Sequence, residues 1–550
     1  MSAAAGRDRS AMRLALLGLG FVLGFSLIGL RMAVLAGSEP EARRGGSGEA
    51  ISSARADIVD RAGRLLATNL ETASLYARPH EMVDIDATAL ALREVLPELP
   101  DRKIKALFRE GAKFVWLQKV LSPEQRQAVH DIGSPGLLFG AREMRLYPNG
   151  ALAAHVLGGA RFGAEGVSAA EVLGVGGVER AMDARLRERP DEPLRLTLDL
   201  SIQAIVEEVL GGGMTLLNAA GAAAVVMDVR TGEIVAVASL PDFDPNDRPP
   251  PPVEGDPSEA ATFNRAVQGV YELGSVFKAF TTANALELGL VSPGTMIDTK
   301  GPMRSGRHTI RDYGNYGDVL SVTDVMVHSS NIGTARMALA AGANRHAAFL
   351  EALGFAGPLG VELSEARTVR TGMPERWPDI TVMTSSYGHG VSVTPLHVAA
   401  AYATLTGDGT LVLPTLLPVD PRSPRGERIV SEQTARQMRA MLRAVVTEGT
   451  ASMARIEGYA IGGKTGTADK VDAVNGGYLK DRNINTFAAV FPALDPQYVI
   501  VVTFDEGNAE VGHKSGRNAG LTAVPVAAEI VRRVAPLLGI APEEALLAAR

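Results

Sequence analysis

The stretch YAIGGKTGT at residues 459–467 predicts a β-strand, and two more strand signals follow it, TFAAVF at 486–491 and YVIVVTF at 498–504. An earlier stretch at 222–238, AAAVVMDVRTGEIVAVA, predicts a hairpin of two apolar strands around a glycine turn. Long alanine-rich helical stretches lie between the two groups of strands. Because strands at both ends of this unit enclose helices, we expect an antiparallel α+β domain over about residues 215–550.

Helical signals flank the predicted sheet. Residues 202–209 place apolar side chains at i, i+3, i+4 and i+7 of a helix. Pro525 predicts the start of a final helix that runs to about Leu538. Residues 55 to about 200 instead mix short strand-like and helical stretches, which predicts a separate domain of mixed α/β character.

Composition excludes several classes of protein. The 550 residues are 46% hydrophobic and 21% charged, which excludes a disordered chain, and the length alone suggests three or four domains. The absence of cysteine excludes disulfides, thiol nucleophiles and thiolate metal sites. A net charge of −7 gives no reason to expect nucleic acid. Only 10 of the 55 basic residues are lysines, so the position of each lysine is informative.

The N-terminal region carries the signal of a membrane anchor. Leu14–Leu30 is an uncharged run of 17 residues, and apolar residues continue to Ala36. This stretch is long enough to cross a bilayer core of about 30 Å. We therefore expect a single transmembrane anchor at 14–36. A cleaved signal peptide, with its cleavage site after Val34-Leu35-Ala36, is the alternative.

The charges around this span predict its orientation. Three arginines, at positions 7, 9 and 13, precede the span. The positive-inside rule places residues 1–13 in the cytoplasm and everything after the span outside it. Residues 37–54 are rich in Gly, Ser, Glu and Arg, which is typical of a flexible linker.

The first chemical motif is Ser275-Val276-Phe277-Lys278, the only S-x-x-K in the chain. If Ser275 opens a helix, the two polar side chains lie about one turn apart on one face. A neutral Lys278 can take the hydroxyl proton, and neutrality at pH 7 requires its pKa to fall by roughly two to three units from about 10.4. Taken alone, however, such a pair is common on ordinary solvated helices.

Two further motifs follow in the same domain. The first is Ser329-Ser330-Asn331, which in isolation favours a helix cap or a buried polar turn. The second is Lys464-Thr465-Gly466-Thr467, in a glycine-rich strand typical of a sheet edge that a ligand approaches closely. Lys464 supplies a second cation, and Thr465 and Thr467 present hydroxyls on one face because they are two residues apart on a strand.

Other reaction classes fit the sequence less well. The stretch from Gly458 to Thr465 formally matches the phosphate-binding loop G-x-x-x-x-G-K-[ST], but it continues as an extended segment where a nucleotide-binding loop opens a helix. The chain has no G-x-S-x-G elbow and no H-E-x-x-H zinc motif. His389 could border a site, although a structural role in its loop is favoured. We expect neither a cofactor nor a metal.

Taken together, S-x-x-K, S-x-N and K-T-G are the signature set of penicillin-binding proteins and serine β-lactamases. The chain resembles a class B penicillin-binding protein, a monofunctional peptidoglycan D,D-transpeptidase, over nearly its whole length. Its segments that carry the rest of this resemblance are Arg55–Ile58 with Asp60–Ala67, Arg145–Pro148, Ala154–Gly158, Ser386–Gly390 with Thr394-Pro395, and Glu448–Ala451.

The resemblance implies a pedestal, or dimerisation-type, domain at 55–200 and a transpeptidase domain at 201–550. The latter is expected to contain a five-stranded antiparallel sheet flanked by helices and an all-helical subdomain. Asn331 makes the chain more similar to the septal, cell-division type (penicillin-binding protein 3) than to the elongation type, which often has Asp there. Leu273 and Val276 depart from the family, which usually has Pro and Thr at these positions, but neither change removes a reacting group.

The resemblance also implies roles for individual residues. Ser275 is the nucleophile and Lys278 its base, while Ser329 relays a proton and Asn331 orients Lys278 and the substrate amide. Lys464 lowers the Lys278 pKa and, with Thr465, Gly466 and Thr467, holds the terminal carboxylate of a D-Ala-D-Ala stem peptide. The backbone N–H groups of Ser275 and Thr467 form the oxyanion hole.

The implied ligands are stem peptides and β-lactams, and the implied partners are division proteins, including a lipid-linked glycan polymerase. The implied location is the inner (plasma) membrane, with the catalytic domain periplasmic or otherwise extracytoplasmic. An elongation-type enzyme, a β-lactamase or carboxypeptidase, and a non-catalytic penicillin-sensing receptor are the alternatives at this stage.

Overall fold

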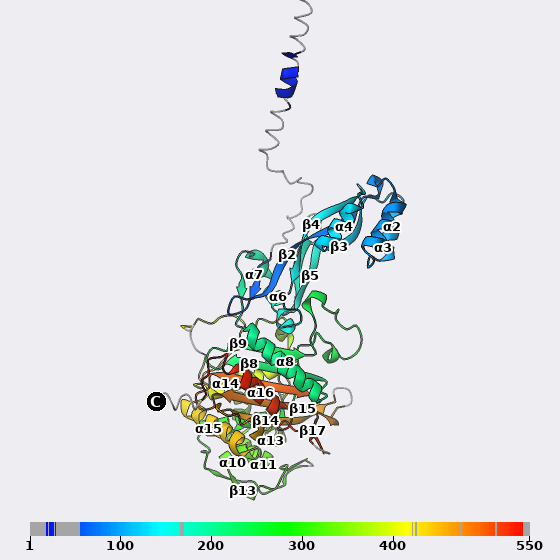
Figure 1. Ribbon diagram of the computed structural model, residues 1–550. Coiled ribbons are helices and arrows are strands. Elements are labelled where there is room, and N and C mark those ends of the chain that lie inside the picture. The colour runs from blue at the N-terminus through cyan, green and yellow to red at the C-terminus, as the bar shows by residue number, and fades with distance from the viewer. Residues whose placement is uncertain are drawn as a thin grey trace, which may run out of the picture. The chain divides into compact units, whose positions relative to one another are not determined.

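The computed structural model describes residues 18–19, 21–26, 28, 55–165, 170–306, 308–420, 422–423, 426–472, 476–511 and 514–542 (Figure 1). The chain divides into two units, Met1–Ile51 and Ser52–Arg550. The predicted tail at 1–13 and linker at 37–54, and most of the predicted anchor at 14–36, lie outside the described residues. Within the described part of the chain, no helix combines the length and the apolar character that a membrane span requires.

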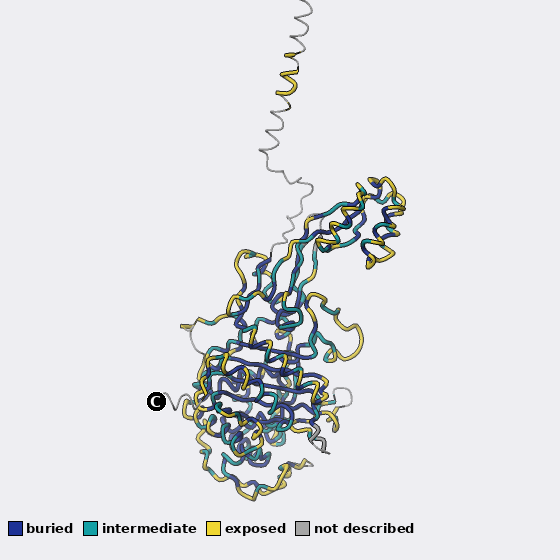
Figure 2. The backbone as a smooth tube through the Cα atoms, in the orientation of Figure 1, coloured by how far each residue is buried: buried dark blue, intermediate teal, exposed yellow. Residues whose placement is uncertain are grey.

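The second unit contains a five-stranded antiparallel sheet with the strand order β14-β15-β16-β8-β9. Its strands are β8 (Gly221–Asp228), β9 (Ile234–Leu240), β14 (Gly462–Val471), β15 (Tyr478–Phe491) and β16 (Tyr498–Asp505). The strands β8 and β16 and the second half of β15 are mostly apolar because helices cover both faces of the sheet. Figure 2 shows this buried layer in dark blue. The predicted antiparallel sheet is confirmed.

Two pairs of helices pack against the sheet. The helix α8 (Leu200–Leu216) contacts α16 (Ala523–Val534), and both contact the sheet. The helix α14 (Pro395–Thr406) contacts α15 (Glu432–Glu448), β8 and β16. The predicted helices at 202–209 and from Pro525 are therefore present as α8 and α16. The latter starts two residues earlier than predicted and ends at Val534, not Leu538.

A mainly helical region lies between β9 and β14. It contains α9 (Lys278–Glu287), α10 (Val322–Val327), α11 (Asn331–Ala341), α12 (Ala343–Ala352) and α13 (Asp379–Ser385). The prediction of an all-helical subdomain is wrong in one respect, since two short ladders also form here. They pair β10 (Met296–Asp298) with β13 (Val319–Ser321), and β11 (Met303–Ser305) with β12 (His308–Ile310). Strands of three residues are too short to show a period in the sequence.

The N-terminal part of the second unit has its own sheet. Its strands are β1 (Ile58–Val59), β2 (Leu65–Ala77), β3 (Val115–Leu121), β4 (Leu137–Leu146) and β7 (Leu194–Arg195), and β5 (Gly159–Glu165) pairs with β6 (Ala170–Gly176). The helices are α2 (Ile85–Val95), α3 (Asp101–Leu107), α4 (Pro123–Asp131), α5 (Ala154–Leu157), α6 (Gly177–Ala181) and α7 (Asp183–Glu188). A small apolar core joins α2, α3 and α4 to β3.

A buried ion cluster supports the base of this part. Arg55 donates from Nε to Glu179 Oε2 at 2.6 Å, and Arg145 donates from Nε to Glu179 Oε1 at 2.7 Å. The side chains of Arg55 and Glu179 are fully buried, so the cluster is held by close pairing and not by solvent. Tyr147, whose OH donates to Glu179 Oε1 at 3.2 Å, belongs to the same apolar core as residues of β8 and α8. The two parts of the unit therefore share one core.

Candidate active site

Ser275 lies in a 3₁₀ turn, Gly274–Phe277, that leads directly into α9. The α-helix itself begins three residues after Ser275, at Lys278. The consequence for the motif is small, since side chains three residues apart eclipse in a 3₁₀ turn and Ser275 and Lys278 still share a side. Gly274 has φ +61°, and a Cβ there would lie 2.7 Å from the carbonyl oxygen of Thr467. Only glycine allows the turn to approach β14 this closely.

The Lys278 side chain is buried, and its amine contacts Ser329. Its Nζ donates to Ser329 Oγ at 2.9 Å and also contacts the Ser329 carbonyl oxygen. Burial, assisted by the positive charge of Lys464, lowers the pKa of Lys278 well below its ordinary value. This is the condition for a lysine to act as a base near neutral pH.

Lys464 approaches the same hydroxyl from the sheet. Its fully buried Nζ donates to Ser329 Oγ at 2.9 Å and to the carbonyl oxygen of Thr465 at 3.1 Å. Burial lowers the pKa of Lys464 to about 7. A serine hydroxyl has two acceptor sites and one proton to give. Ser329 therefore connects the two amines and can pass a proton between them and a bound ligand.

Asn331 is the first residue of α11, next to this cluster. Its Nδ2 donates to the carbonyl oxygen of Arg311 at 2.9 Å. Among the hydrogen bonds of the described residues, none joins Asn331 to Lys278, which differs from the orientation that the sequence motif implies. The Asn331 side chain is partly exposed.

The K-T-G motif lies on β14, which pairs only with β15 among the strands of the described region. Its outer edge faces the turn of Ser275, where a Cβ on Gly466 would lie 2.1 Å from the Leu273 carbonyl oxygen. Thr467 is exposed, whereas Thr465 is buried and its Oγ1 lies 2.8 Å from Thr450 Oγ1. The predicted edge strand is confirmed. The segment continues as a strand after Thr465, which also excludes the nucleotide-binding loop.

The sequence did not predict the polar contacts of Glu272, which lies three residues before Ser275 in the chain. Glu272 accepts a hydrogen bond from the Gly390 backbone N–H at 2.9 Å and one from Tyr478 OH at 3.0 Å. The ring of His389 lies between Tyr387 and Tyr478, with centroid distances of 5.3 and 5.8 Å. His389 thus packs beside Tyr478, which bonds to Glu272, three residues before Ser275 in the chain. Glu272 and Tyr478 are separated by 206 residues, so no local sequence pattern predicts their contact.

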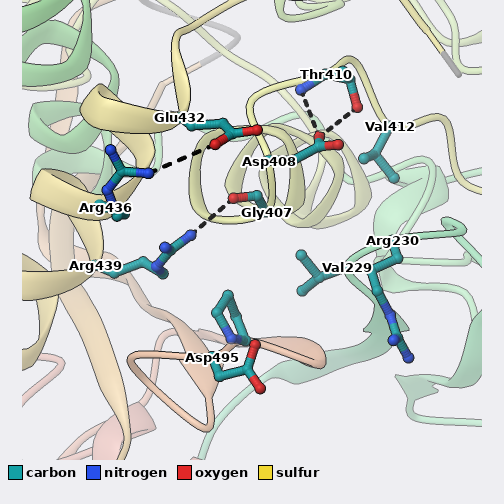
Figure 3. Close-up of a pocket in the computed structure, with 11 residues that line it drawn as sticks. Val229, Arg230, Gly407, Asp408, Thr410, Val412, Glu432, Arg436, Arg439 and Asp495 are labelled. Atoms are coloured by element: carbon teal, nitrogen blue, oxygen red, sulfur yellow. Dashed lines mark hydrogen bonds and ion pairs between the residues drawn. The ribbon is translucent and has the colours of Figure 1, made fainter.

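A separate cavity of about 310 Å³ opens between the β8–β9 turn, the end of α14, α15 and the β15–β16 turn (Figure 3). Several of its charged groups have partners within the protein. Arg439 donates to the carbonyl oxygens of Thr406 and Gly407 at 2.9 Å each, and Arg436 faces Glu432 at 3.6 Å. None of the three motifs lines this cavity.

Comparison with known proteins supports the assignment of the two parts of the chain. Residues 222–532 match the penicillin binding protein transpeptidase domain, and residues 50–192 match the penicillin-binding protein dimerisation domain. The chain is 35% identical over 508 residues to the probable peptidoglycan D,D-transpeptidase FtsI of Caulobacter vibrioides, covering 90% of this chain and 83% of that protein. It is 30% identical over 525 residues to the peptidoglycan D,D-transpeptidase FtsI of Escherichia coli, with 90% and 85% covered.

A solved structure gives the same result. The crystal structure of penicillin binding protein 3 from Mycobacterium tuberculosis, complexed with aztreonam, superimposes with a TM-score of 0.66 and 26% sequence identity. The superposition covers 89% of this chain and 97% of that one. The order of the motifs, the sheet that carries them and these matches agree with one another: the chain belongs to the class B penicillin-binding proteins, the family of peptidoglycan D,D-transpeptidases.

Proposed function

We propose that this protein is a serine D,D-transpeptidase that cross-links peptidoglycan stem peptides through an acyl-enzyme on Ser275. The observation that carries the proposal is the convergence of Lys278 and Lys464 on the Ser329 hydroxyl, beside the turn that presents Ser275. Two buried amines with lowered pKa values supply a base and a cation within one hydrogen-bonded group.

In the acylation step, neutral Lys278 takes the proton of the Ser275 hydroxyl. The serine oxygen then attacks the carbonyl carbon of the penultimate D-Ala of the donor peptide. The resulting oxyanion lies between the backbone N–H groups of Ser275 and Thr467, and such a donor typically contributes about 3–4 kcal/mol to lowering the barrier. Support comes from the backbone contact between the Ser275 turn and Thr467, which Gly274 permits.

The intermediate collapses when the bond to the terminal D-Ala nitrogen breaks. Ser329 gives its proton to that nitrogen and is reprotonated by Lys278, so free D-Ala leaves as an amine. Lys464 and the hydroxyls of Thr465 and Thr467 hold the terminal carboxylate during this step. A charged hydrogen bond of this kind is worth more than a neutral one, and it selects peptides that end in a free carboxylate.

An amine of a neighbouring stem peptide then attacks the acyl-enzyme and releases Ser275. The product is an amide cross-link between two peptidoglycan strands. A β-lactam reproduces the acylation step, but its opened ring remains attached and blocks the acceptor amine. Asn331, whose side chain is partly exposed, is proposed to orient the substrate amide.

We also propose a septal role, with residues 14–36 as an anchor in the inner membrane and residues 55–550 in the periplasmic or extracytoplasmic space. In this proposal residues 55–200 form the pedestal and residues 201–550 the transpeptidase domain. The names of the two FtsI relatives support the septal role, and the charge pattern around residues 14–36 supports the orientation. Division-complex proteins, including a lipid-linked glycan polymerase, are the proposed partners.

Labelling with a fluorescent penicillin tests the acylation site. We expect stable label on the wild type and none on Ser275→Ala, with the labelled peptide containing residue 275. Persistent label on the alanine variant would overturn the choice of nucleophile. Release of the label within minutes would indicate a β-lactamase, and stable label without cross-linking of peptidoglycan in vitro would indicate a penicillin sensor.

A cell-biological test separates the septal and elongation roles. Depletion of the protein should give filamentous cells if it acts at the septum. Round cells on depletion would contradict the septal role and support the elongation-type alternative, while leaving the acylation chemistry unaffected.

A further inference from the structure

The Asp312 carboxylate lies at the start of α11, next to the Ser329-Ser330-Asn331 segment. Its Oδ1 accepts hydrogen bonds from the backbone N–H groups of Asn331 at 2.6 Å and Ile332 at 3.0 Å. Its Oδ2 accepts a hydrogen bond from Ser330 Oγ at 2.6 Å. Three donors therefore end on one carboxylate, which comes from the loop after β12 and not from α11 itself.

The segment that Asp312 holds is one that the backbone does not favour. Ser329 has φ +59°, a left-handed conformation that costs energy for a residue with a side chain. The neighbouring backbone bonds are the Ser329 N–H to the Met326 carbonyl oxygen at 3.3 Å and the Ser330 N–H to the Val325 carbonyl oxygen at 2.9 Å. In this conformation both Ser329 oxygens point to Lys278. The backbone bonds hold this turn from within, and Asp312 adds a restraint from outside it through Ser330, Asn331 and Ile332.

The carboxylate also contributes a charge to the site. The charged or titratable groups that act on Lys278 are Lys464 from β14, Asp312 from the loop after β12 and His389 from the turn after α13. Burial and Lys464 lower the Lys278 pKa, whereas Asp312 acts in the opposite direction and raises it. Asp312 is thus the carboxylate that opposes the two lowering effects.

We propose that Asp312 is a positioning residue for acylation, which fixes Ser329, Ser330 and Asn331 against Lys278 and Lys464. It does not touch the reacting atoms, and it acts through the segment that it holds. The inference rests on the function proposed above and adds a residue that none of the three motifs contains. It has two separable consequences, one geometric and one electrostatic.

The alternative is that Asp312 only caps α11, in which case its loss would lower stability and leave the chemistry unchanged. Two variants separate these readings. Asp312→Asn keeps an acceptor for the two backbone N–H groups but removes the charge. Asp312→Glu keeps the charge but displaces the carboxylate by one methylene. Asp298→Asn is the matched control, because Asp298 also pairs with α11, at 2.9 Å from Arg336, but lies outside the motif contacts.

The experiment measures the second-order rate constant of acylation by a fluorescent penicillin from about pH 5 to pH 10, with the midpoint of thermal unfolding recorded for each variant. The acidic limb of this profile reports the base of the free enzyme. We expect Asp312→Asn to move the acidic limb to lower pH by about half a unit or more. The pKa of Lys278 falls because its protonated form loses the attraction of the nearby carboxylate. We expect Asp312→Glu to leave the limb in place and to lower the plateau about tenfold, since the Ser329 turn shifts.

Each outcome decides the matter. An unchanged limb and a plateau within about twofold of the wild type in both Asp312 variants would overturn the inference, as would a limb that moves to higher pH in Asp312→Asn. If Asp312→Asn does not fold, the plateau of Asp312→Glu still tests the geometric part. Failure of the wild type to be labelled at Ser275 would instead refute the proposed function. Asp298→Asn should match the wild type in both limb and plateau.

Discussion

The contact between Gly466 and the turn of Ser275 allows a quantitative test of the site geometry. In Gly466→Ala the new Cβ would lie 2.1 Å from the Leu273 carbonyl oxygen and 3.0 Å from Val276 Cγ1. The first neighbour is backbone and cannot rotate away. Because real Cβ atoms essentially never come closer than 3.0 Å, β14 and the turn must separate by close to 1 Å.

This displacement falls on the proposed oxyanion hole. One donor, the Thr467 N–H, is on the residue after Gly466, and the other, the Ser275 N–H, is on the turn that would be pushed away. A misplacement of about 1 Å in a catalytic group costs about 10²-fold, and the loss of one oxyanion donor costs about 10²- to 10³-fold. We therefore expect the acylation rate constant of Gly466→Ala to fall by about 10²- to 10³-fold.

The assay is the second-order rate of labelling by a fluorescent penicillin, with the unfolding midpoint measured on the same samples. Gly360→Ala is the control, since nothing lies within 4 Å of the Cβ position there. A folded Gly466→Ala protein that is acylated within about threefold of the wild-type rate would show that the strand and the turn move together without cost. The steric argument would then be wrong.

Three further outcomes are expected, each measured by urea unfolding. Gly212→Ala should raise the free energy of unfolding by about 0.5–1 kcal/mol, because it lies in the interior of α8 and its new Cβ would contact nothing. Gly213→Ala should show no such gain, because its new Cβ would collide with side chains of β16 and α16. Glu179→Gln should lower the free energy of unfolding by about 3–5 kcal/mol, since two buried arginines lose their shared anion. Lys464→Met should raise it at pH 7, because burial holds the folded-state pKa near 7 and the unfolded chain binds that proton more tightly. This gain should disappear as the pH rises to about 11 and above, past the pKa of the unfolded lysine, where both states are neutral.

The apolar parts of the sheet could be predicted from the sequence, and its polar ends could not. The predicted strand at 498–504 matches β16 to within one residue. The prediction for 486–491 covers less than half of β15, which begins at Tyr478. The missing residues, YLKDRNIN, are mostly polar and pair with the end of β14. Asp481 and Arg482 are exposed, whereas Asn483 and Asn485 are polar although they are buried. A hydrophobic pattern reports the burial of apolar side chains, so exposed residues and buried polar residues leave no signal.

The motifs predicted which residues meet, but not how each is held. Lys278 at the start of α9 and Lys464 on β14 converge on the Ser329 hydroxyl. The turn that carries Ser275 packs against β14. The partner of Asn331 was not foreseen, because it is a backbone carbonyl in a loop without a pattern. Asp312 was missed for a similar reason. A single Asp in a loop matches no sequence motif, and only the folded structure shows that it contacts α11.

The site is built at a cost in stability, and this cost explains its position in the fold. The buried amines of Lys278 and Lys464 oppose folding at pH 7, because the unfolded chain would hold both as solvated cations. Such groups persist only where the surrounding structure is rigid enough to exclude water and other conformations. The apolar sheet supplies that rigidity for Lys464, and the packed junction of α9 and α11 supplies it for Lys278. Since Ser329 connects both, the motifs lie where the sheet meets the helical region, beside the edge strand β14.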